Sequence, residues 1–152
     1  LPFLDEQDLY DEYDQSQPWD SEHNLKVLKR MPAVYRHPNA TGDPTHTSFF
    51  VFVGEGTFGG EEPGHGIVIH NITDGSSNTI MTVEAKREIP WTKPEDIPYD
   101  ADKDVPKLGG FSEGGFNIGL ADGSVRFIEE DLDVEVLRHL ITRNGGEVIP
   151  NF

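Results

Sequence analysis

Cysteine is absent from this chain of 152 residues, so disulfide bonds and thiolate metal sites are excluded. Long apolar runs are absent too, since no stretch reaches the roughly 18 residues that a membrane-spanning helix needs. No secretory signal can be recognised. The chain begins at Leu1 without an initiator Met, so we expect a processed or trimmed N-terminus with room for a membrane segment upstream.

Basic residues are scarce. Twelve Lys and Arg stand against 28 Asp and Glu, which gives a formal net charge of -16. This charge repels the phosphates of nucleic acids and the headgroups of anionic membranes, so the sequence excludes both as direct partners. The same charge favours solubility and is compatible with divalent cations as ligands.

The sequence also lacks the signatures of catalysis. It has no G-x-S-x-G motif, and its histidines form neither H-x-x-x-H nor H-E-x-x-H. The glycines of 54–60 imitate a dinucleotide-binding loop, but a glutamate pair and Pro63 follow where a helix should begin. We therefore predict no enzymatic activity, no catalytic residues and no organic cofactor. The histidines, for which we expect structural or surface positions, are His23, His37, His46, His65, His70 and His139.

Sixteen Gly and eleven Pro indicate many turns and long loops, and the length suits one domain over 1–152. We expect a short amphipathic helix within 5–14. A second helix is expected after it, with Asp20 or Ser21 as its N-cap and Pro32 at its end. The apolar stripe of this second helix consists of Leu25, Leu28 and Met31. The expected strands are 47–53, 66–69 and 78–85, and the first, apolar on both faces, is predicted to be central. The order predicts an α+β fold with an antiparallel sheet packed on helices.

A hairpin over 116–128 is the strongest local signal. Asp122-Gly123 stands between two alternating runs and is typical of a two-residue type I′ turn. That turn pairs Leu120 with Val125 and Ile118 with Phe127, and places all four with Phe116 on one apolar face. Before the hairpin, 86–110 is predicted to be a long exposed loop, and after it we expect a helix over 133–144 that Asp133 caps and Gly145-Gly146 ends.

Within the long loop, Asp100, Asp102 and Asp104 have the spacing of metal ligands. Carboxylates at alternate positions of a tight loop can converge on Ca²⁺. The EF-hand pattern fails, because its sixth position is Val105 and its twelfth is Phe111. A calcium loop of another kind stays open beside the alternative of a solvated acidic loop.

Trp19 and Trp91 each lie next to a proline. Packing is favoured for both, with surface recognition as the alternative. Asn39-Ala40-Thr41 and Asn71-Ile72-Thr73 match the glycosylation sequon, whose use depends on the host.

Several segments together resemble a bacterial prepilin-type family of unknown function that carries a C-terminal His-x9-Asp-Gly signature. The matching segments cover most of the chain: the opening 1–10, 18–21, Asp74-Gly75-Ser76-Ser77-Asn78-Thr79-Ile80 with Val83-Glu84-Ala85, 90–96, 114–127 and 140–147. One position departs from the pattern, because Ser112 stands where the signature has its histidine. Any role tied to that histidine is therefore not carried over.

The resemblance implies a pilin-like or pseudopilin-like protein, with a leader and an apolar helix upstream of Leu1 and a globular α+β head. It implies export to the periplasm, the cell surface or the outside, other pilin-like subunits or further copies of the chain as partners, and contact with a membrane only through the upstream helix. The hypothesis is a non-enzymatic structural or assembly protein, with filament formation left open. The alternative is a calcium-dependent module that binds carbohydrate or protein through Asp100, Asp102 and Asp104.

Overall fold

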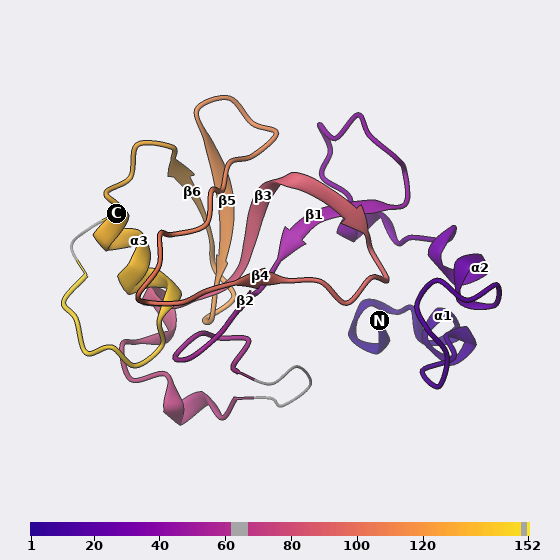
Figure 1. Cartoon of the computed structure of the whole chain (residues 1–152), viewed down its shortest axis with the longest axis horizontal. Coiled ribbons are helices and arrows are strands. Elements are labelled where there is room, and N and C mark those ends of the chain that lie inside the picture. Colours follow the sequence, from indigo (N-terminus) through magenta and orange to yellow (C-terminus); the bar gives the residue numbers. More distant parts are fainter. Residues whose placement is uncertain (62–66, 150–151) are drawn as a thin grey trace. The chain divides into compact units, whose positions relative to one another are not determined.

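The computed structural model describes residues 1–61, 67–149 and 152 (Figure 1). Of the residues considered above, Pro63, His65 and Gly66 lie outside this part. The chain divides into two compact units. The small unit consists of Leu1–Ser48 and Arg87–Glu95, and the large unit of Phe49–Lys86 and Asp96–Phe152.

A four-stranded sheet has the order β1-β3-β5-β6, and its strands are β1 (His46–Phe50), β3 (Ile80–Pro90), β5 (Gly115–Leu120) and β6 (Val125–Glu129). β3 pairs with β5, and β5 with β6, both in antiparallel fashion. The predicted α+β class is confirmed.

The strand predicted over 47–53 is divided in two, and its first part is not central. β1 forms an edge of the four-stranded sheet, and the chain then continues into β2 (Phe52–Val53), which pairs in parallel with β4 (Ile97–Pro98). Phe50 and Phe52 are both buried. The two-sided apolar pattern therefore arises because consecutive pieces of the chain serve different sheets, not because one strand is buried on both faces.

β3 is longer than predicted. It extends to Pro90, so 86–90 belong to a strand and not to the long loop, and β4 lies within the loop as well. Pro90 can end a strand because the N–H that proline lacks is not needed there. The strand predicted over 66–69 is wrong in its described part: Ile69–Asn71 form a 3-10 helix, and Val68 and Ile69 are exposed.

The hairpin forms where it was predicted, but its register is shifted by one residue. Gly119 pairs with Val125 and Ile118 with Arg126. Gly123 has a φ of 86°, whereas Asp5 is the only described residue other than glycine with positive φ, so Asp122 cannot take the type I′ conformation. Instead, Leu120 N donates to Ser124 O at 2.8 Å around a three-residue turn that ends in Gly123.

This shift turns the side chains of β6 over, because neighbouring strand residues point to opposite faces. Ile128 is buried, whereas Val125 is 70% and Phe127 49% exposed. The predicted apolar face is thus right for Phe116, Ile118 and Leu120 in β5 and wrong for β6.

The helices are short. α1 (Gln7–Glu12) follows a 3-10 turn at Pro2–Leu4, α2 spans Asn24–Leu28, a further 3-10 turn spans Ala33–Tyr35, and α3 spans Val134–Ile141. Asp133 caps α3 as predicted, since its carboxylate accepts from the N–H groups of Glu135 and Val136. α3 ends at Ile141, before Gly145, because Thr142 is already extended. The predicted stripe of α2 is wrong at Leu25, which is 37% exposed, while Val27 is buried.

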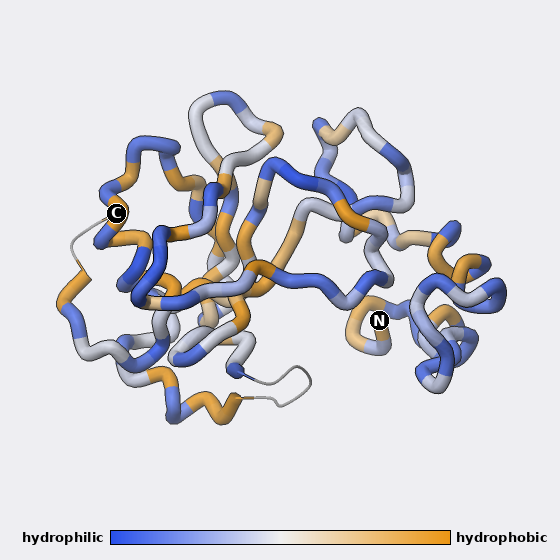
Figure 2. Tube along the Cα trace, in the orientation of Figure 1, coloured by the Kyte–Doolittle hydropathy of each residue, from blue (hydrophilic) through white to orange (hydrophobic). Residues whose placement is uncertain are grey.

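Apolar residues are distributed in short stretches along the trace (Figure 2). Within the described residues, no helix has the length and apolar character needed to cross a membrane. In the large unit, buried side chains come mainly from β3, β5 and α3; they include Ile80, Val83, Phe116, Ile118, Leu120, Leu140 and Ile141.

Candidate functional site

A buried carboxylate lies within the large unit. Glu84 of β3 has no exposed surface. Its Oε1 accepts from Phe111 N at 2.7 Å, and its Oε2 accepts from Asn117 N and Asn117 Nδ2, both at 3.0 Å. Three N–H donors compensate for the water that this carboxylate gives up on burial. This arrangement ties β3 to β5 and to the segment before it, which is a structural task.

Ser112 lies in that same segment. It forms an isolated bridge with Gly115, next to Phe111, whose N–H Glu84 accepts. A methyl group on Gly110 would lie 2.8 Å from Glu84 Oε1, so the chain approaches the carboxylate closely here. The position where the resemblance expects a histidine therefore belongs to a tight turn beside a buried acid.

Asp74 holds a second junction between matching segments. Its Oδ2 accepts from Gly145 N at 2.7 Å and its Oδ1 from Gly146 N at 2.9 Å, while Asp74 N donates to Arg143 O at 3.2 Å. Gly146 has a φ of 81°, which a side chain would resist. We refer to these bonds as the Asp74 clamp.

The turn of the hairpin is attached to the same region. Asp122 N donates to Ser76 O at 3.0 Å, and Ala121 N donates to Thr79 O at 2.9 Å. The segments that carry the resemblance in the large unit are thus bonded to one another through backbone groups. Each of these contacts has a structural task.

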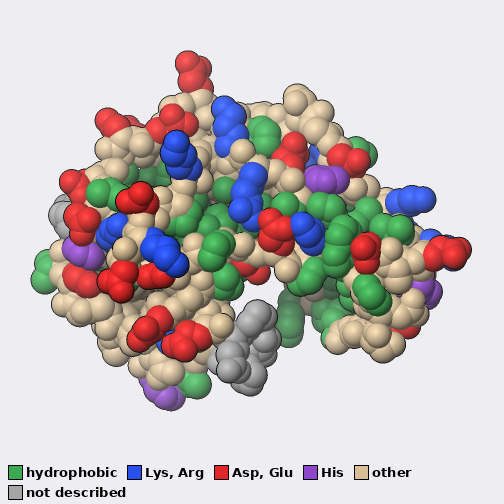
Figure 3. Space-filling view, viewed as in Figure 1, with side chains coloured by type: hydrophobic (Ala, Val, Ile, Leu, Met, Phe, Trp, Pro, Cys, Tyr) green, Lys and Arg blue, Asp and Glu red, His purple; other side chains and the backbone are tan. Residues whose placement is uncertain are grey.

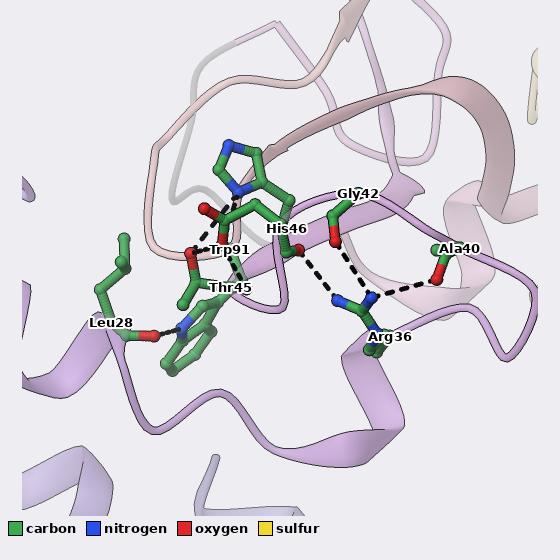
Figure 4. A network of polar contacts seen from close by, with 8 residues as sticks. Leu28, Arg36, Ala40, Gly42, Thr45, His46 and Trp91 are labelled. Atoms are coloured by element: carbon green, nitrogen blue, oxygen red, sulfur yellow. Dashed lines mark hydrogen bonds and ion pairs between the residues drawn. The ribbon is translucent and has the colours of Figure 1, made fainter.

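In the small unit, polar contacts hold the loop before β1 (Figure 4). Arg36 donates to three carbonyl oxygens, those of Asp43 at 2.9 Å, Ala40 at 3.0 Å and Gly42 at 3.3 Å. Asp43 Oδ1 accepts from Thr45 Oγ1 at 2.6 Å and from Thr45 N at 2.8 Å, and these bonds lower the pKa of the Asp43 carboxyl group. His46 Nδ1 lies 3.4 Å from the same oxygen.

Trp91 joins distant parts of the small unit. Its Nε1 donates to Leu28 O at 2.9 Å, and its backbone N donates to Thr45 O at 3.1 Å. Its ring stacks on Tyr35, with centroids 5.5 Å apart and planes inclined by 19°. Trp91 therefore has the packing role that was predicted for it.

Trp91 also lines a pocket. A depression of about 300 Å³ is lined by Leu1, Tyr10, Tyr13, Gln15, Trp91 and Thr92. A second depression of about 650 Å³ shares Tyr10, Tyr13 and Gln15 with it and is also lined by Asp11, Glu12, Asp14, Ser16 and His23. Because they share a wall, we treat them as one feature, the aromatic groove. Trp19 is not among its lining residues.

Two segments that the sequence resemblance singles out contribute to the smaller part of the groove. Leu1 and Tyr10 belong to the opening segment, whereas Trp91 and Thr92 come from the segment over 90–96. Gln15 Nε2 donates to Tyr10 Oη at 3.0 Å and fixes one side of the groove. Sequence reasoning noted Trp91 but missed the groove, because nothing in the pattern joins residues 1–15 to 91–92.

The predicted calcium ligands are only partly brought together. Asp100 and Asp102 line a depression of about 380 Å³ with Glu55 and Tyr99, and Asp104 is not among its lining residues. Asp100 Oδ2 lies 2.8 Å from Lys103 Nζ, and Asp100 Oδ1 accepts from Asp102 N at 3.0 Å; both lower the pKa of the Asp100 carboxyl group. In the part of the chain that the structure describes, no three His, Asp or Glu residues are grouped so that they could hold a metal ion.

His23 and His37 make local structural contacts. His23 Nε2 lies 2.7 Å from Glu12 O, and the buried His37 accepts from Asn39 N at 3.1 Å through Nδ1. The sequon residues Asn39 and Asn71 are both exposed.

Comparison with known families gives one match. A family described as "Protein of unknown function (DUF1559)" matches residues 1–67. No curated protein and no solved structure matches the chain. The matched part contains α1, α2, β1 and β2, together with most residues of the aromatic groove. The hairpin signature and Ser112 lie beyond it.

Proposed function

We propose that this chain is the head of an exported, pilin-like protein that acts in assembly by binding other subunits and catalyses no reaction. The observation that carries the proposal is the family match over residues 1–67, a family associated with pilin-like and secretion proteins. The α+β architecture is compatible with such a head.

The placement of the matching segments supports a binding role. The carboxylates of Glu84 and Asp74 accept hydrogen bonds from backbone N–H groups, which gives both a structural task. In the small unit, by contrast, Tyr10 and Trp91 contribute to an open groove as well as to packing. A surface that combines aromatic residues with a fixed hydrogen-bonded frame is typical of protein recognition.

The experiment is to determine the intact mass and N-terminal sequence of the protein purified from its native cells, after separation of cytoplasmic, membrane and released fractions. We expect an exported form whose sequence extends upstream of Leu1 through an apolar helix, with a cleaved and methylated start. In-cell cross-linking should then give products with other pilin-like subunits. An unprocessed form recovered from the cytoplasm would overturn the proposal.

A further inference from the structure

The aromatic groove combines aromatic rings with carboxylates. Tyr10, which is 41% exposed, and Tyr13 line both of its parts, and Trp91 lines the smaller one. Asp11, Glu12 and Asp14 line the larger part. Figure 3 shows hydrophobic and acidic side chains side by side over the part of the surface where α1 and α2 lie in Figure 1. Residues 5–14 have no basic side chain and carry the acids Asp5, Glu6, Asp8, Asp11, Glu12 and Asp14.

Hydrogen bonds and an ion pair hold the carboxylates that line the groove. Asp14 accepts from Ser16 Oγ at 2.6 Å and from Ser16 N at 2.9 Å, and these bonds lower the pKa of its carboxyl group. Asp11 accepts from Gln7 Nε2 at 2.7 Å, and this donor is a neutral amide. Arg30 forms an ion pair with Glu12 and offsets the charge of that carboxylate.

This chemistry selects a cationic ligand. A guanidinium group stacks on an aromatic face and pairs with a carboxylate at the same time, which neither an anion nor an apolar side chain can do. The two parts of the groove, about 300 Å³ and about 650 Å³, leave room for more than one side chain. We propose that the aromatic groove binds an arginine-bearing, basic segment of a partner subunit. This inference rests on the proposed function, of which it names the partner chemistry.

The net charge argues against a second copy of this chain as the occupant. Each copy carries a formal charge of -16, so two copies repel each other. A partner with a basic segment gains from the same field, which speeds its association.

The probe is the peptide (Arg-Gly)3, acetylated at its N-terminus and amidated at its C-terminus, with (Gln-Gly)3 as the neutral counterpart. Binding is measured by isothermal titration calorimetry at fixed ionic strength. We expect the arginine peptide to bind and the glutamine peptide not to bind. Tyr10→Ala should weaken binding about fivefold, because the exposed ring supplies a cation–π contact.

Two matched controls separate the groove from general charge attraction. Tyr10→Phe keeps the ring and should leave the affinity within about twofold of the wild type. Asp11→Asn and Asp131→Asn remove the same charge, but Asp131 is an exposed residue of the large unit. Asp11→Asn should weaken binding about threefold and Asp131→Asn less than about 1.5-fold. Circular dichroism of each variant confirms the fold.

Equal affinities for all four variants would show attraction by net charge alone and overturn the inference, and so would a lack of binding to the wild type. Neither result would change the outcome of the mass and fractionation experiment that tests the proposed function. Conversely, an unprocessed cytoplasmic protein would overturn the proposed function while leaving the peptide affinities unchanged. The two failures are therefore distinguishable.

Discussion

In the large unit, β5 and β6 satisfy the backbone groups of each other, whereas in the small unit side chains bond to several backbone groups. β5 and β6 pair along their length. In the small unit the fully buried Asn24 donates through Nδ2 to the carbonyl oxygens of Asp14 at 3.0 Å and Pro18 at 2.9 Å. Arg36 bonds three further carbonyl oxygens in the same manner.

The difference follows from how a chain without regular structure must satisfy its polar groups. Each carbonyl that no strand or helix pairs needs another donor, and residues with several N–H groups can serve more than one. The large unit uses the reverse arrangement, in which one carboxylate accepts from several N–H groups, at Glu84 and at Asp74. We expect the two units to respond differently to the loss of such residues.

The largest effect should come from Glu84. Glu84→Ala removes the acceptor of the Phe111 and Asn117 N–H groups and leaves a cavity, which we expect to lower the free energy of unfolding by about 3 kcal/mol. Urea unfolding followed by circular dichroism measures this. Glu129→Ala, at an exposed position of β6, is the control and should cost less than about 0.5 kcal/mol. Similar losses for both variants would mean that the large unit does not depend on its buried acid.

Trp91 provides the corresponding test of the small unit. Trp91→Ala removes the stacking on Tyr35 and the bond to Leu28 O, with an expected loss of about 2 kcal/mol. Trp91→Phe keeps an aromatic ring and should lose about half as much. Hydrogen exchange provides the local measurement: amides of the small unit should lose protection while those of β5 and β6 keep theirs. A uniform loss over both units would contradict the comparison.

Low pH should lower the stability of both units, because in each of them hydroxyl and backbone N–H groups donate hydrogen bonds to an aspartate. Side-chain hydrogen bonds from Ser16, Thr45 and Ser124 lower the pKa values of Asp14, Asp43 and Asp122, respectively. A carboxyl group whose pKa is lower in the folded state stabilises the fold above its unfolded value of about 4, and this stabilisation is lost as the pH falls through the folded value. We therefore expect the free energy of unfolding to be constant between about pH 5 and 7 and to fall below about pH 4.

Matched variants assign the acid sensitivity to a unit. Asp43→Asn in the small unit and Asp122→Asn in the large unit should each flatten the pH profile below about pH 4. Urea titrations at several pH values measure this. A profile that neither variant changes would place the acid-sensitive groups elsewhere.

Calcium should have the smallest effect. The calcium hypothesis for Asp100, Asp102 and Asp104 predicts that Ca²⁺ raises the melting temperature and that EDTA reverses the rise. Because Lys103 already pairs with Asp100, we expect a change of less than about 1 °C on millimolar Ca²⁺. A larger rise that Asp102→Asn abolishes would favour the binding-module alternative.

How far the sequence predicted the fold can be seen in the hairpin. Its place, its antiparallel pairing and the buried residues of β5 follow from alternation and from Asp122-Gly123. Its register does not, because a two-residue turn, with positive φ at Asp122, and a three-residue turn, without it, both accept the same dipeptide. The length of the turn decides which face of β6 meets water.

The candidate site was predictable only in part. Trp91 stood out as an aromatic residue beside a proline, and Glu84 lay in a recognised segment. Their partners are far away in the sequence: Leu28 and Tyr35 for Trp91, Phe111 and Asn117 for Glu84. Local periodicity carries no information on such pairs. Regular spacing can also mislead: Asp100, Asp102 and Asp104 alternate in the sequence, but Asp104 does not line the depression.

The Asp74 clamp has a consequence for the order in which the chain folds as it is synthesised. A polypeptide emerges with its N-terminus first, so Asp74 waits for about seventy residues before Gly145 and Gly146 appear. Tyr35 likewise meets Trp91 only after β3 has emerged. A chain that stops short of Gly145 would lack the N–H groups that close this clamp. The clamp can therefore close only after α3 has been synthesised, which makes its closure a late step of folding.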